Sequence, residues 1–142
     1  MLTAEVKDYL KKVTFLAPSV RELWIIGSRA NGNARDESDW DFLAFGELGA
    51  LEEVAAAPSL HLDYIDLLVV RPDGTFERPW GESKSGSLGA WEWSPVDATH
   101  AKYVGTKWIP DREAEEEGID TLGDIQRRTL WAYKVWPDRE CS

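Results

Sequence analysis

The sequence predicts a mixed α/β or α+β domain, and three observations support this class. Apolar residues recur at helical spacing near the N-terminus. Short runs rich in β-branched and aromatic residues follow, as expected of strands that are buried on both faces. Turn residues or short helical segments separate these runs. The resulting order of helix, strand, turn, strand, helix and strand is typical of a sheet with helices packed against it.

The first half of the chain is predicted to contain a helix and three strands. Gly and Pro punctuate it, and an Arg-Pro-Asp-Gly turn closes it. The predicted elements are a helix over about residues 4–13, strands over 20–26, 39–45 and 60–70, a helical turn over 28–31, a loop over 32–38, a short helix over 48–57 and a turn over 71–74.

The sequence changes character after residue 74, where six of the eight tryptophans lie past residue 71. We treat the chain as one domain over 1–142, with a core over about 1–74 and a Trp-rich extension over about 75–142. Buried tryptophans are usual in cores and interfaces, so Trp91 and Trp93 are expected to pack rather than line a binding site. The elements predicted here are short strands or loops near 88–93 and 100–108, an exposed acidic segment over 111–118 and a closing helix over 120–136.

The composition restricts the class of protein. With 142 residues, 43% hydrophobic and 30% charged, the chain resembles one soluble globular domain. No apolar run approaches the roughly 20 residues that cross a bilayer, and the N-terminal residues lack the pattern of a secretory signal. The single cysteine, Cys141, excludes an internal disulfide. We therefore expect a cytoplasmic protein.

The net charge of −10 is spread along the whole chain. Residues 1–71 contain 7 Lys and Arg against 12 Asp and Glu, and residues 72–142 contain 9 against 14. Long nucleic acids bind largely through their phosphates to basic surfaces. The charge therefore disfavours a long nucleic acid as partner, although a local basic patch would escape this count.

The strongest functional signal is a Gly-Ser turn followed by two aspartates. Gly27 and Ser28 end a predicted strand, where small residues let backbone N–H groups approach an anion. Asp39 and Asp41 begin the next strand and should point to the same face. Adjacent carboxylates repel unless a cation lies between them, and such hard oxygen ligands suit Mg²⁺. Each feature alone has an ordinary structural interpretation, but together they flank one loop, which favours phosphoryl or nucleotidyl transfer.

These residues, with Arg29, Gly32, Ser38 and an aspartate on a later strand in Ile65-Asp66-Leu67-Leu68-Val69, resemble the nucleotidyltransferase superfamily typified by DNA polymerase β, and especially its minimal members. The resemblance covers residues 20–70 and implies a nucleotidyltransferase fold, a mixed sheet flanked by helices. It also implies transfer of a nucleoside monophosphate from an NTP to a hydroxyl, with release of pyrophosphate. The residues after 74 match neither the short nor the long members, so the acceptor does not follow from it.

The resemblance also implies roles for individual residues. Asp39 and Asp41 would hold two Mg²⁺ ions on the triphosphate, and Asp66 would hold the metal at the acceptor hydroxyl. Gly27 and Ser28 would bind the terminal phosphates.

Two further residues complete the nucleotide-binding prediction. Arg29 has two interpretations of equal weight, a contact to phosphate or a surface pair with an acid. Ser38 is expected to organise the turn before the aspartates.

The choice of third carboxylate lies between Asp63 and Asp66. An odd separation places them on opposite faces of a regular strand, so one of them joins Asp39 and Asp41. Asp66 lies within an apolar run, where a charge is costly to bury without a compensating partner. We expect a metal ion to be that partner, so that an Asp66→Asn change abolishes transfer and leaves the fold intact or more stable. Asp63 is expected to be an exposed or turn-side acid, although a β-bulge between the two residues would reverse the assignment.

Two alternatives of another kind remain open. One is an antitoxin-like module that acts by binding a partner protein, with tryptophans at the interface. The other is an inactive homologue that binds nucleotide without turnover, which the complete set of aspartates disfavours.

Overall fold

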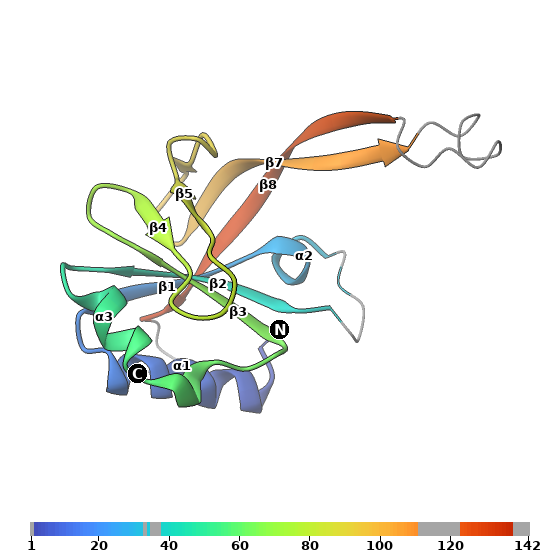
Figure 1. Cartoon of the computed structure of the whole chain (residues 1–142). Coiled ribbons are helices and arrows are strands. Elements are labelled where there is room, and N and C mark those ends of the chain that lie inside the picture. The colour runs from blue at the N-terminus through green and yellow to red at the C-terminus, as the bar shows by residue number, and fades with distance from the viewer. Residues whose placement is uncertain (1, 33, 35–37, 111–122, 138–142) are drawn as a thin grey trace.

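A mixed sheet forms the centre of the fold, and the computed structural model describes residues 2–32, 34, 38–110 and 123–137. The strands of this eight-stranded sheet lie in the order β5-β4-β3-β2-β1-β8-β7-β6. Strands β2 and β3 are parallel and the other paired strands are antiparallel (Figure 1). Their bounds are β1 (Val20–Ile26), β2 (Trp40–Gly46), β3 (Ile65–Val70), β4 (Thr75–Glu77), β5 (Ser85–Ser87), β6 (Ser94–Pro95), β7 (His100–Pro110) and β8 (Gly123–Trp136).

α1 (Ala4–Leu16) and α3 (Ala50–Ala55) lie together on one face of this sheet, and α2 (Gly27–Ala30) follows directly from the end of β1 (Figure 1). The longest, α1, begins where the Thr3 hydroxyl accepts the backbone N–H of Val6 at 3.1 Å, which satisfies one of the free donors of the first turn. The 3₁₀ turn η1 (Pro58–Leu60) comes after α3 along the chain. No helix of the described residues is long and apolar enough to span a bilayer.

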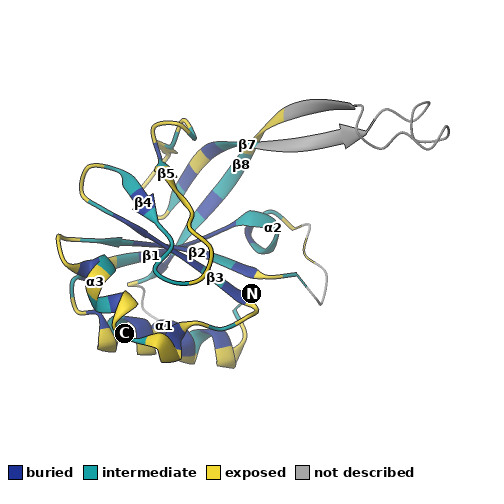
Figure 2. Ribbon diagram, viewed as in Figure 1, coloured by how far each residue is buried: buried dark blue, intermediate teal, exposed yellow. Residues whose placement is uncertain are grey.

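An aliphatic core fills the space between α1 and the sheet. Its helical side is the predicted apolar stripe of α1, which is buried (Figure 2). Its sheet side alternates along the strands, so that Phe42 and Ala44 face α1 while Leu43 faces away. Burying each such side chain contributes about 1.5 to 3 kcal/mol of transfer free energy.

An aromatic core covers the opposite face of the sheet. Trp24 packs edge-on against Trp93 with ring centroids 5.5 Å apart, and Trp91 packs against Phe76 and Tyr103. The chain between β5 and β7 supplies Trp91 and Trp93. The prediction that these tryptophans pack is confirmed.

The prediction for residues 120–136 is wrong, because β8 replaces the closing helix. β8 pairs with β7 on one side and with β1 on the other, so the end of the chain fills the free edge beside the first strand. Its residues from Thr129 to Trp136 are mostly β-branched and aromatic, which suits a strand. The apolar spacing favoured a helix, but pairing with β1 and β7 overrides that local pattern.

Smaller differences concern element limits. The predicted helix over 4–13 and the first two strands are confirmed within three residues. The third strand begins at Ile65 rather than near residue 60, since η1 and a turn occupy the start of that run. Short strands or loops were expected near 88–93 and 100–108. The first stretch forms turns, and the second lies within β7. The acidic segment 111–118, Cys141 and part of the loop 32–38 lie outside the described residues.

Candidate functional site

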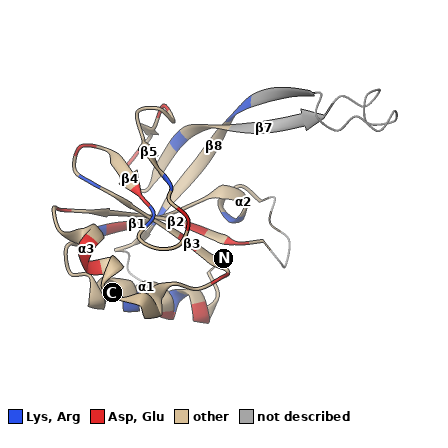
Figure 3. Cartoon of the chain, in the orientation of Figure 1, with Lys and Arg blue, Asp and Glu red and all other residues tan. Residues whose placement is uncertain are grey.

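Parallel pairing of β2 and β3 brings two carboxylates together. Asp41 is the register partner of Asp66, so the two side chains lie side by side on the face of the aromatic core. Both are partly buried, while Asp39 is exposed just before β2 begins. Acidic residues also occur on α1 and α3 (Figure 3). What distinguishes this pair is that the two partly buried carboxylates are register partners on neighbouring strands.

Gly27 closes the site on the β1 side. It follows the β1 residue that pairs with Asp41, and it has φ +74°, a left-handed conformation that glycine adopts without strain. A Cβ atom at this position would lie 2.4 Å from Oδ2 of Asp41. The predicted Gly-Ser turn therefore lies against the predicted carboxylate.

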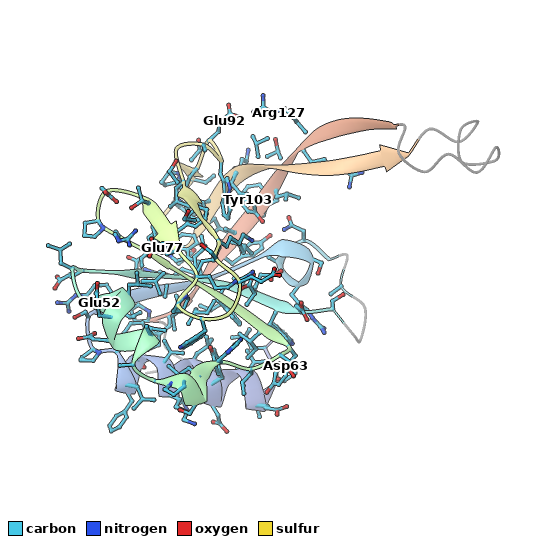
Figure 4. The ribbon with its side chains drawn as sticks, in the orientation of Figure 1. Glu52, Asp63, Glu77, Glu92, Tyr103 and Arg127 are labelled. Atoms are coloured by element: carbon cyan, nitrogen blue, oxygen red, sulfur yellow. The ribbon has the colours of Figure 1, made fainter. Side chains whose placement is uncertain are left out.

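Two residues that sequence reasoning missed hold this turn in place. The Gly27 N–H donates to the Tyr103 hydroxyl at 3.0 Å, so that amide is already engaged within the protein (Tyr103 is labelled in Figure 4). The Asn31 side chain donates to the Gly27 carbonyl at 2.8 Å and accepts the Trp131 N–H at 2.8 Å. These bonds attach α2 to β7 and β8. Local sequence gives no signal for them, because Tyr103 and Trp131 are far away in the chain.

Asp41 has an unusual electrostatic environment. Burial is the largest cause that raises its pKa to about 6, followed by the negative charges of Asp66 and Asp39. Lys84 and Arg78 act in the opposite direction, and more weakly. Ionised Asp41 therefore lacks full compensation within the protein, and a cation bound beside it would supply that compensation.

Asp66 already has a partner, which corrects the expectation that a metal ion alone would compensate its charge. Arg78 Nε donates to Oδ1 of Asp66 at 3.1 Å, and Nη2 donates to Oδ2 at 3.2 Å. Both side chains are 25% exposed. Such a two-point guanidinium–carboxylate pair is strong and fixed in direction. Arg78 lies just beyond β4, where extending the β3–β4 register beyond Val69 and Glu77 brings it toward Asp66.

Arg29 and Ser38 contact each other. The Arg29 guanidinium donates to the Ser38 carbonyl at 2.8 Å and lies 4.6 Å from the centroid of the Trp40 ring. Arg29 therefore anchors the chain just before β2. The sequence suggested either a contact from Arg29 to phosphate or a surface pair between Arg29 and an acid. The contacts to Ser38 and Trp40 were not foreseen. A contact to phosphate stays a proposal.

Asp63 lies apart from the carboxylate pair, in the turn before β3, and is exposed (Figure 4). It lines a pocket of about 240 Å³ whose other walls include Asp66, Arg78 and Trp80. His61 stacks on Trp80 there, with ring centroids 5.4 Å apart. The odd-separation argument does not apply to Asp63, because β3 begins at Ile65 and Asp63 lies in the turn before it. Asp66 is the one that pairs in register with Asp41.

The donor chemistry of the pair fits a hard divalent cation. Carboxylate oxygens are the ligands that Mg²⁺ prefers, and the charge of Asp41 is only partly compensated. Among the described residues, no group of three or more His, Cys, Asp or Glu side chains is arranged as a metal site. Both oxygens of Asp66 accept bonds from Arg78. Asp39, Asp41 and Asp66 are the residues that would hold a cation.

Comparison with known proteins gives one similar structure. No family model and no curated protein sequence matches the chain. A crystal structure of "a putative nucleotidyltransferase" from Sulfolobus solfataricus is similar at 25% sequence identity and a TM-score of 0.41. The likeness covers 48% of this chain and 65% of that one, just under two thirds of its length. A likeness of this extent leaves the chemistry to be argued from the site's own residues.

Proposed function

We propose that the protein is a metal-dependent nucleotidyltransferase that moves a nucleoside monophosphate from an NTP to a hydroxyl of a small molecule or a protein. The observation that carries the proposal is Asp41. It is partly buried, it lies beside Asp66 and against Gly27, and its charge is only partly compensated within the protein. A carboxylate kept in this state is suited to a ligand that brings its own cations, as a nucleoside triphosphate with Mg²⁺ does.

The reaction joins the acceptor oxygen to the α-phosphorus and breaks the bond from that phosphorus to the bridging oxygen. Pyrophosphate leaves with the bonding electrons, and the acceptor hydroxyl loses its proton to the surrounding water. Bound Mg²⁺ would supply positive charge to the attacking and leaving oxygens, which is the main source of catalysis in such transfers.

The chain's own residues have the positioning roles. Asp39 and Asp41 would hold the cations of the triphosphate, and Asp66 the cation at the acceptor oxygen. Gly27 and Ser28 would lie against the terminal phosphates, with contact made chiefly through Ser28 because the Gly27 N–H is bonded to Tyr103. Arg29 and Ser38 would border the same side of the site.

The proposed acceptor class rests on charge. Acidic and basic residues are interspersed along the described chain (Figure 3), and both halves of the sequence have more acidic than basic residues. A small molecule or a protein hydroxyl is therefore favoured over a nucleic-acid end.

The direct test is a labelling experiment. The protein is incubated with each of the four NTPs, labelled at the α-phosphate, with Mg²⁺ and with or without cell extract, and the labelled product is identified. We expect one product class with wild type and with Asp63→Asn, and none with Asp41→Asn. Absence of any product, or equal labelling by Asp41→Asn, would contradict the proposal.

A further inference from the structure

Arg78 occupies the position of a cation at Asp66. Its two bonds engage both carboxylate oxygens, at 3.1 and 3.2 Å. A divalent cation ligated by Asp66 needs at least one of these oxygens. Because two positive groups at one carboxylate also repel each other, a cation and the guanidinium compete for Asp66.

The Arg78 side chain is attached in a way that permits exchange. Its backbone is fixed, because the Arg78 N–H donates to the Lys84 carbonyl at 2.9 Å. Beyond Asp66, its guanidinium has one further bond, to the exposed Glu82 carbonyl at 3.4 Å, which is near the limit for a hydrogen bond. The side chain is a quarter exposed. Rotation about side-chain bonds therefore suffices to leave Asp66, without a change in the strand.

Space for the released side chain lies next to it. The pocket of about 240 Å³ is bordered by Arg78 and Asp66, and Asp63 and Glu82 line it as well. The exposed Glu82 carboxylate takes part in no hydrogen bond or ion pair with the described residues, so the guanidinium can move beside it.

We propose that Arg78 is an exchangeable counter-ion: it neutralises Asp66 in the metal-free protein and leaves when a divalent cation binds between Asp41 and Asp66. This inference rests on the cation site of the proposed function. Arg78 is then a positioning residue, because its ion pair with Asp66 sets the affinity of Asp66 for a divalent cation. Arg78 also forms a wall of the pocket, so uptake of the cation changes the shape of the pocket.

The first experiment measures Mn²⁺ binding by electron paramagnetic resonance, with no nucleotide present. Arg78→Gln is compared with wild type and with Arg71→Gln, which removes an arginine of the same hairpin that pairs with Glu77 instead. We expect Arg78→Gln to bind Mn²⁺ about tenfold more tightly, equivalent to about 1.4 kcal/mol. Arg71→Gln should stay within about twofold of wild type, as screened surface charges allow. If Arg78 has only a structural role, Arg78→Gln should bind Mn²⁺ as tightly as wild type or more weakly, and this result would overturn the inference. Absence of Mn²⁺ binding by both wild type and Arg78→Gln would overturn it as well.

The second experiment uses the wild-type protein and does not depend on the folding of a variant. The Arg Nε–H signals are followed by ¹⁵N NMR during a Mg²⁺ titration, and the Arg78 signal is identified by its loss in Arg78→Lys. We expect the Arg78 signal to move and the Arg71 signal to stay in place. An Arg78 signal that stays in place while Mg²⁺ displaces bound Mn²⁺ would overturn the exchange.

The two proposals fail in different ways. Exchange without any labelled product would contradict nucleotidyl transfer and leave the counter-ion role standing. Labelled product without exchange would contradict the counter-ion role alone.

Discussion

The two sides of the carboxylate pair differ in how negative charge is compensated. On the β3 side, Asp66 accepts two bonds from Arg78. On the β1 side, Asp41 lies against Gly27, and its pKa is raised to about 6. The strands place both residues at the same level of the sheet. The comparison shows that the fold neutralises Asp66 with the Arg78 guanidinium. It leaves part of the charge of Asp41 to be neutralised by a bound cation.

The largest expected effect of breaking this asymmetry is on catalysis. Asp41→Asn removes the only partly compensated carboxylate and should lower the rate of labelled transfer by about a thousandfold, since metal-assisted charge stabilisation contributes several kcal/mol. Asp63→Asn is the matched control, because Asp63 is an exposed aspartate outside the pair, and its rate should stay within about threefold of wild type, a change of less than 1 kcal/mol. Activity lost with Asp63→Asn and kept with Asp41→Asn would reverse the assignment.

The same change should stabilise the metal-free protein in a pH-dependent manner. Below the ordinary pKa of 3.8, Asp41 is protonated in both the folded and the unfolded state, so its burial has no electrostatic cost. The cost grows as the pH rises and is complete above about 6. Asp41→Asn should therefore raise the free energy of unfolding by roughly 2 to 3 kcal/mol at pH 8 and not at pH 3.5. Urea titrations in chelator at both pH values test this, and an equal gain at both would contradict it.

A substitution of Gly27 tests how closely its backbone approaches the Asp41 carboxylate. Gly27→Ala forces a side chain into φ +74° and against Asp41 Oδ2, and should destabilise the fold by about 2 kcal/mol. Gly32→Ala is the control, since Gly32 has φ +75° and nothing within 4 Å of an added Cβ. It should cost about 1 kcal/mol from backbone strain alone. Equal losses in thermal unfolding would show that the contact with Asp41 contributes nothing.

The smallest expected effect lies on the β3 side. Asp66→Asn leaves Arg78 without a charged partner, so it should destabilise the metal-free protein by about 1 kcal/mol. The effect is modest because both side chains are partly exposed. This reverses the expectation from sequence that the change would leave the fold intact or more stable. Combining it with Arg78→Gln should recover part of the loss in urea titrations. A gain in stability for Asp66→Asn alone would mean that the ion pair does not compensate the charge.

The sequence predicted the elements around the carboxylates because their signals are local. Strand periodicity fixed which residues of β2 face each core, and the position of Asp66 in an apolar run distinguished it from Asp63. The Gly-Ser turn was visible as small residues that end an apolar run. Each of these arguments needs only neighbours in the chain.

The rest depended on contacts between distant segments. β8 was predicted as a helix because its apolar residues recur at helical spacing, but pairing with β1 and β7 overrides that local pattern. Tyr103 and Asn31 fix the Gly27 turn through bonds to or from β7 and β8, so no local pattern reveals them. The contact between Arg78 and Asp66 could have been predicted from the sequence. The turn over 71–74 predicts a hairpin, and that hairpin brings Arg78 back toward Asp66.

The most direct test of the central claim is a calorimetric titration of the protein with ATP, CTP, GTP and UTP, each in Mg²⁺ and in chelator. If Asp41 is kept for a ligand that brings its own cations, at least one NTP should bind in Mg²⁺ and none in chelator. Asp41→Asn should lose the Mg²⁺-dependent binding. Equal affinity of the wild-type protein for an NTP in both conditions would contradict the account.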